Sequence, residues 1–149
     1  MEVLILQPDI LIKKIRNNLV SQKERLTTYL KVLDEENNDI KTQDADKLLE
    51  HISIEKSIIE ELNSFKKILE PLDLIYNNSP YKKDDIISNL KSKLEQLTSN
   101  IKDKQDINIE LLTNTVNSIG LKLQEVSAQN KKNKPTYNNI QSAYVDIIG

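Results

Sequence analysis

The sequence contains no cysteine and no tryptophan, and only two of its 149 residues are glycine. Without cysteine the chain has neither disulfide bonds nor thiolate metal ligands, so a reducing intracellular compartment is its natural setting. Gly120 and Gly149 are too far apart to form a glycine-rich phosphate loop. A mixed α/β domain needs more turn residues than this chain has, and the shortage favours an all-α fold.

Long apolar runs and a strong net charge are also missing. The apolar run from Val3 to Leu6 is shorter than a signal-peptide core, and no segment reaches membrane-spanning length. A net charge of -2 provides no field that attracts nucleic acid, although Lys131, Lys132 and Lys134 form a small basic cluster. We therefore expect a cytoplasmic protein that neither inserts into a membrane nor binds nucleic acid.

Catalytic and metal-binding patterns are scarce as well. His51 is the single histidine of the chain, and no set of ligands stands around it in the sequence. The acidic pairs are adjacent residues, which diverge by about 100° on a helix and cannot share a proton as a catalytic carboxylate pair does. These pairs are interpreted as a solvated face: Glu35-Glu36, Glu60-Glu61 and Asp84-Asp85. We expect no enzymatic activity and no cofactor.

What the chain does contain is 38% hydrophobic residues spaced at steps of three and four, the pattern of amphipathic helices. A first helix is predicted at residues 9–40, opened by Pro8 and Asp9. Its buried seam follows Ile12, Ile15, Leu19, Gln22, Leu26, Tyr29, Leu33 and Ile40. At 149 residues the chain has room for one domain.

A second helix is predicted at residues 45–70, with Thr42 or Asp44 as its cap. Its seam follows Leu48, Ile52, Ile59, Leu62, Phe65 or Lys66, and Leu69. Pro71 is expected to end it, because proline cannot continue the hydrogen-bond ladder. Residues 71–83 are then a loop that packs four apolar side chains over the end of the bundle: Leu72, Leu74, Ile75 and Tyr76.

A third helix is predicted at residues 84–131, opened by Asp84 and Asp85. Its seam follows Ile87, Leu90, Leu94, Leu97 and Ile101, and resumes at Ile109, Leu112, Val116, Ile119, Leu123 and Val126. The step from Ile101 to Ile109 is eight residues rather than seven, so the supercoil changes locally or the helix breaks near residue 105. We favour the continuous helix.

The predicted helices differ in length, being about 48, 39 and 72 Å long at a rise of about 1.5 Å per residue. About 20 to 30 Å of the third helix therefore has no partner helix. We predict that its apolar stripe binds another protein: Leu112, Val116, Ile119, Leu123 and Val126. Two alternatives bury the same stripe, namely a break near residue 105 that forms a fourth helix, and mutual cover by two copies.

Residues 132–149 change character, since Asn133, Pro135, Asn138 and Asn139 interrupt the helical pattern. Apolar side chains are nevertheless spaced through the segment, with Tyr137 and Tyr144 the most prominent. We predict a flexible tail that orders on a partner through Tyr137 and Tyr144. The alternative is a frayed terminus.

Several segments together resemble the FlgN-type flagellar export chaperones. The helical pair carries the residues Leu26–Glu36, Gln43–Leu49 and Glu55–Leu62, similar to the leucine-rich first helix, short turn and Glu-rich second helix of that family. In the tail, Pro135–Asn138 is similar to a Thr-Tyr-Asn element and Ser142–Asp146 resembles the closing segment. Two residues depart from the pattern, where Gln43 and Ile140 stand in place of glycines.

The resemblance implies a cytoplasmic chaperone that binds and masks hook-filament junction (hook-associated) proteins and delivers them to the flagellar type III export gate. In that family the cargo-binding part is C-terminal. The expected architecture is an elongated antiparallel three-helix bundle or coiled coil, monomeric or weakly dimeric, without a cofactor. The alternative is a structural coiled-coil subunit of a secretion or filament apparatus that self-assembles, and a regulatory adaptor bundle is also compatible with the sequence.

Overall fold

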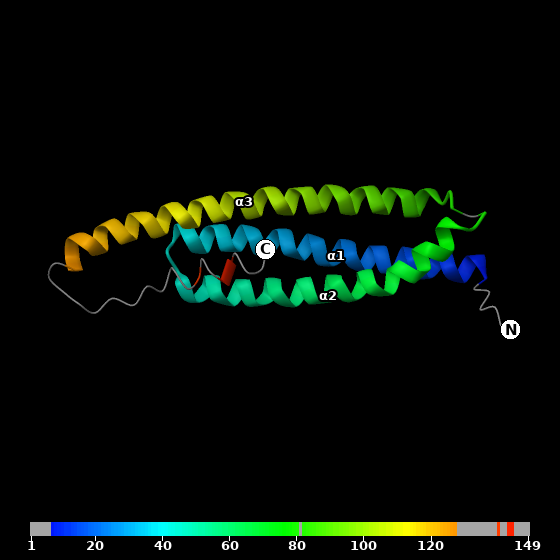
Figure 1. The fold of residues 1–149 in the computed structure, drawn as a ribbon, viewed down its shortest axis with the longest axis horizontal. Helices are drawn as coiled ribbons and strands as arrows, with labels where there is room; N and C mark the ends of the chain where they lie inside the picture. Colours follow the sequence, from blue (N-terminus) through cyan, green and yellow to red (C-terminus); the bar gives the residue numbers. More distant parts are fainter. Residues whose placement is uncertain (1–6, 81, 128–139, 141–142, 145–149) are drawn as a thin grey trace. The chain divides into compact units, whose positions relative to one another are not determined.

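The computed structural model describes residues 7–80, 82–127, 140, 143 and 144, with side chains given through Gly120 and at residues 140, 143 and 144. Three α-helices form in this part of the chain: α1 (Pro8–Lys41), α2 (Ala45–Asn77) and α3 (Asp85–Ser127). The helices pack against one another (Figure 1), and no strand occurs among the described residues. The predicted all-α three-helix bundle is confirmed.

The chain divides into two compact units, and each helix contributes a stretch to both. Unit 1 contains residues 1–28 and 58–99, and unit 2 contains residues 29–57 and 100–149. The first part of α1 therefore packs with the second part of α2 and the first part of α3. The remaining parts of the three helices form unit 2.

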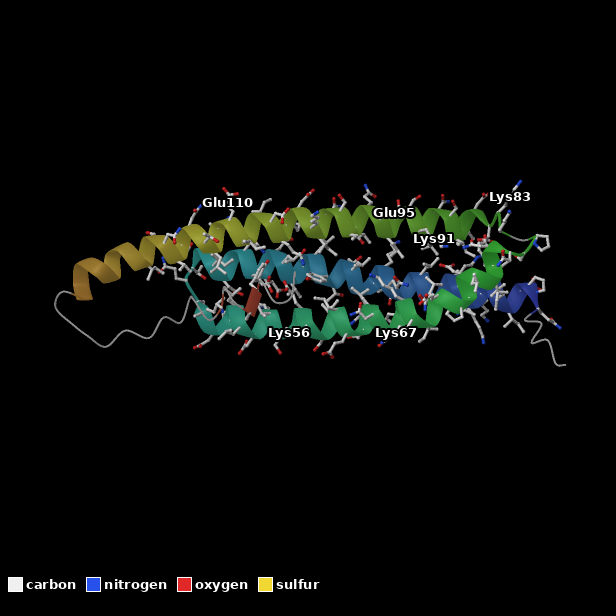
Figure 2. The ribbon with its side chains drawn as sticks, viewed as in Figure 1. Lys56, Lys67, Lys83, Lys91, Glu95 and Glu110 are labelled. Atoms are coloured by element: carbon white, nitrogen blue, oxygen red, sulfur yellow. The ribbon has the colours of Figure 1, made fainter. Side chains whose placement is uncertain are left out.

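The core of unit 1 is apolar, and hydrogen bonds and an ion pair between polar side chains surround it. Its buried side chains come from all three helices: Leu11, Ile15, Leu19, Leu69, Tyr76 and Ile87. Gln22, the one polar residue of the predicted first seam, is buried and donates to Asn18 Oδ1 at 2.7 Å. Asn18 in turn donates to the carbonyl of Phe65 at 2.9 Å, so these two hydrogen bonds join α1 to α2. Lys91, labelled in Figure 2, lies 3.0 Å from Asp73.

The predicted end of the second helix at Pro71 is wrong, because α2 runs through Pro71 to Asn77. Proline removes the hydrogen bond to the carbonyl of Lys67, but both residues are exposed and water can bond that carbonyl. The extra turns place Tyr76 in the core, where its hydroxyl accepts the Asp84 N–H at 2.9 Å. This packing outweighs the lost hydrogen bond.

The cover predicted for the bundle end is therefore only partly present. Leu72 and Tyr76 pack against the unit 1 core. Leu74 and Ile75, predicted to pack there too, are 67% and 45% exposed. Because residues 71–77 are helical, successive side chains point in different directions and only one face of the segment meets the core.

The turn between α1 and α2 is closed by a Schellman motif. The N–H of Asp44 donates to Asp39 O at 2.9 Å, and the N–H of Gln43 donates to Ile40 O at 3.1 Å. Gln43 has a φ of 57°, the left-handed conformation that favours glycine. Asp44 then caps α2, accepting the N–H of Lys47 at 3.1 Å.

The third helix is continuous from Asp85 through the region of residue 105, so the break considered from the sequence does not occur. The eight-residue step disappears because Asn108, not Ile109, occupies the buried position. Ile101, Asn108 and Leu112 follow one another at steps of seven and four. Asn108 donates to Leu33 O at 2.9 Å and accepts from Asn37 at 2.9 Å, which joins α3 to α1 in unit 2.

Candidate functional site

Within unit 2, α3 extends beyond the turn that joins α1 and α2. The hydrogen bonds of Asn108 place it level with Leu33 and Asn37. From there α1 has one turn left, to Lys41, whereas α3 continues to Ser127. The difference is about 20 Å of helix at about 1.5 Å per residue, and Figure 1 shows α3 running past the turn.

The predicted partner-binding stripe on this part of α3 is less exposed than expected. Leu112 is 1% exposed and belongs to the core, because it lies only one turn beyond Asn108. Val116 and Ile119 are half-buried. The side chains of Leu123 and Val126, and the whole of Tyr137, lie outside the described residues. Of the predicted stripe, Val116 and Ile119 therefore remain as partly accessible apolar side chains.

The C-terminal segment contributes two of the most buried side chains of unit 2. Ile140 is 0% exposed and Tyr144 is 1% exposed, and both have helical backbone. The expectation that Tyr144 stays free until a partner arrives is wrong, because its ring is already buried against the helices. Ile140, one of the two residues that depart from the pattern the sequence resembles, is also fully buried.

Two carboxyl groups are buried beside Tyr144. Glu36 from α1 and Glu55 from α2 are both 0% exposed. Among the described residues, no hydrogen bond of standard geometry reaches their four carboxylate oxygens or the Tyr144 hydroxyl. The interpretation of Glu36 as part of a solvated face is therefore wrong. The pair forms between two helices rather than between neighbours in the sequence.

The burial of these groups changes their proton affinity. Loss of water raises the pKa of Glu36 well above its ordinary value, and the nearby Glu55 raises it further. Burial also raises the pKa of Glu55, although Glu36 and His51 act in the opposite direction. The pKa of the Tyr144 hydroxyl is raised by burial and by both carboxyls. Burial therefore favours the protonated, neutral form of this pair over the doubly ionised form.

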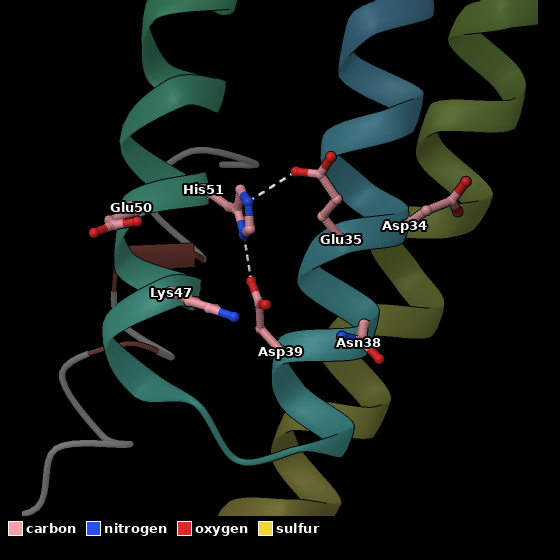
Figure 3. Close-up of a pocket in the computed structure, with 7 residues that line it drawn as sticks. All are labelled: Asp34, Glu35, Asn38, Asp39, Lys47, Glu50 and His51. Atoms are coloured by element: carbon pink, nitrogen blue, oxygen red, sulfur yellow. Dashed lines mark hydrogen bonds and ion pairs between the residues drawn. The ribbon is translucent and has the colours of Figure 1, made fainter.

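An open surface pocket of about 500 Å³ also lies in unit 2. His51 is its centre: Nε2 lies 2.8 Å from Glu35 Oε2, and Nδ1 pairs with Asp39 (Figure 3). The two ring nitrogens of His51 therefore each face a carboxylate of α1. The pocket is lined by Asp34, Glu35, Asn38, Asp39, Lys47, Glu50 and His51.

The sequence did contain a signal for these buried acids. The predicted first seam jumps seven residues from Leu33 to Ile40, and Glu36 is at the step of three between them. The second seam jumps seven from Ile52 to Ile59, and Glu55 is again at the step of three. A skipped position in an otherwise regular seam is thus where each buried acid lies.

In chemical terms, the buried cluster can hold and release a proton, and the pocket can hold a positive charge. Among the described residues, no group of three or more His, Cys, Asp or Glu side chains is arranged to hold a metal ion. In the same part of the chain, none of the helices has a stretch both long and apolar enough to cross a membrane.

Comparison with known proteins gives one similar sequence. An uncharacterized protein of Treponema pallidum (strain Nichols) is 23% identical over 117 residues, which cover 78% of this chain and 75% of that protein. No protein family profile matches the chain, and no solved structure matches it.

Proposed function

We propose that this chain is a cytoplasmic secretion chaperone of the FlgN type, which binds hook-filament junction proteins and delivers them to the flagellar type III export gate. The observation that carries the proposal is the extension of α3 beyond the α1–α2 turn. Val116 and Ile119 lie on that extension and are half-buried. The motif resemblance described above supports the same class.

The proposed mechanism is masking of one helix by another. An amphipathic helix of the cargo packs along the apolar stripe of α3, which keeps the cargo from assembling before export. Each large aliphatic side chain covered in this way contributes about 1.5 to 3 kcal/mol. Binding of this kind uses burial and complementarity, so the chaperone itself needs neither a cofactor nor a nucleotide.

The test uses the full chain, purified hook-associated subunits from the same organism, and calorimetry. Replacing Val116 and Ile119 by Asp is expected to weaken cargo binding at least about 100-fold, since two buried aliphatic side chains are lost. The matched control replaces Asn117 and Ser118 by Asp, which adds the same charge to the exposed side of the same turn. The control should bind cargo like the wild type. Equal binding by both variants, or no binding by the wild type, would contradict the proposal.

The rival function is a structural subunit that self-assembles through the same stripe. Sedimentation at rising protein concentration separates the two. A chaperone stays monomeric or weakly dimeric, whereas a filament subunit polymerises. Polymers that the Val116→Asp and Ile119→Asp changes dissolve would favour the structural function.

A further inference from the structure

The contact between the C-terminal segment and the acid pair forms a closed buried site in unit 2. Tyr144 lies beside Glu36 of α1, Glu55 of α2 and Asn108 of α3. Ile140 is buried as completely and is four residues away. We call Ile140 and Tyr144 the C-terminal anchor. It contacts residues of all three helices at the point where the acids are buried.

The buried site is short of hydrogen-bond donors. Four carboxylate oxygens and one hydroxyl are buried there without a hydrogen bond of standard geometry among the described residues. Two ionised carboxylates cannot both stay in such a place, because repulsion and loss of water act together. In the described part of the chain no lysine or arginine pairs with either acid. A proton is therefore what neutralises the pair.

We propose that the C-terminal anchor is a proton-linked latch: it covers the Glu36–Glu55 pair only while the pair holds a proton, and ionisation of the pair releases it. In the released state water reaches both carboxylates, so each can be ionised at neutral pH. Docking then takes up a proton from solvent, and release returns that proton. This inference goes beyond the proposed function and does not depend on it.

Other polar groups around the pair set its charge balance. From α1 come Tyr29 and Asp39, of which Asp39 acts against ionisation of Glu36. From α2 comes His51, which favours ionisation of Glu55 and is itself bonded to Glu35 and Asp39. From α3 come the uncharged amides of Gln105 and Asn108. His51 thus lies between Glu55 and two other carboxylates, the exposed Glu35 and the buried Asp39.

The test measures the docked fraction of the anchor in the full-length protein by NMR, from the δ1-methyl signal of Ile140. That signal is assigned with an Ile140→Leu variant. Between about pH 6 and 9 the ratio of docked to released anchor should fall by up to about tenfold per pH unit, the dependence for one linked proton. Circular dichroism should show that the helices remain formed over the same range.

Two variants make the test specific. The double change Glu36→Gln and Glu55→Gln keeps the shape of the pair but removes its ionisation, so the anchor should stay docked at every pH in the range. Glu110→Gln changes the charge of an exposed residue of α3, labelled in Figure 2, and should titrate like the wild type. The proposal would be contradicted if the docked fraction of the wild type did not depend on pH, or if it fell equally in the double variant. Loss of helicity in parallel with release would overturn it too.

Discussion

Gln43 shows how a single residue can carry strain in an otherwise regular structure. Its φ of 57° belongs to the region that glycine adopts freely and that a residue with a Cβ adopts at a cost. The Schellman hydrogen bonds from Gln43 and Asp44 need that conformation, so the turn keeps it in spite of the side chain. The FlgN-type pattern that this turn resembles has glycine here, a residue that adopts this φ without strain.

Replacing Gln43 by glycine should therefore stabilise the protein. The expected gain in the free energy of unfolding is about 0.5 to 1 kcal/mol, because the left-handed strain is removed. Urea denaturation followed by circular dichroism measures it. As a control, Lys41→Gly lies in the last helical turn of α1 and should cost up to about 1 kcal/mol. A Gln43→Gly protein less stable than the wild type would contradict this account of the turn.

At the scale of the helices, the seam pattern predicts where elements form but not which polar residues enter the core. The seams locate α1, and the residues predicted to open the next two helices include the observed caps. Of Thr42 and Asp44, it is Asp44 that caps α2, and of Asp84 and Asp85, it is Asp84 that caps α3. The run of α2 through Pro71 could not be predicted, since it depends on the packing of Tyr76. Local rules end a helix at proline, and tertiary contacts override them here.

The candidate site was predicted only in part, because the sequence pattern indicates helix length but not long-range burial. The length of α3 follows from its sequence pattern, and so does the presence of Val116 and Ile119 beyond the turn. The burial of Glu36 and Glu55 does not, because a charged residue is placed outside by default and becomes neutral only once the fold surrounds it. The docking of Tyr144 is likewise a long-range contact that no local pattern encodes.

Asn108 is the residue that fixes the register of α3 against α1. A polar residue in a buried seam limits the alignments that satisfy it, which is a known use of asparagine in coiled coils. Asn108→Ala should lower the free energy of unfolding by about 2 kcal/mol, since two hydrogen bonds are lost and Asn37 loses its partner. The neighbouring Ile107→Ala is the control, because Ile107 is 58% exposed and its loss should cost below about 0.5 kcal/mol. Similar losses in the two variants, measured by thermal and urea unfolding, would remove this role from Asn108.

At the scale of the whole molecule, folding shifts the pKa values of buried or paired carboxyl groups in opposite directions in the two units. In unit 1, Asp84 pairs with Arg16 and caps α3, and the Arg16 guanidinium is the main cause that lowers the pKa of Asp84. In unit 2, burial raises the pKa of both Glu36 and Glu55. Folding thus favours the charged form of Asp84 and the neutral form of the glutamate pair, so the two units respond to pH in opposite directions.

The last prediction follows from these signs. The contribution of Asp84 is complete above its unfolded pKa of about 3.9 and is lost as the pH falls through its lowered folded pKa. The contribution of the glutamate pair is complete below an unfolded pKa of about 4.3 and is lost as the pH rises toward the raised folded value, by about 1.4 kcal/mol per pH unit for one proton. Hydrogen exchange, corrected for its intrinsic pH dependence, measures both responses. Amides of unit 2 such as Leu33 should lose protection from about pH 5 to 8, and amides of unit 1 such as Leu19 should lose protection only below about pH 4.

Asp84→Asn should weaken the acid response of unit 1 and leave that of unit 2 intact, while the double Glu36→Gln and Glu55→Gln variant should do the reverse. If both units lost protection over the same pH range, the opposite pKa shifts of Asp84 and of the glutamate pair would not govern the stability of the units.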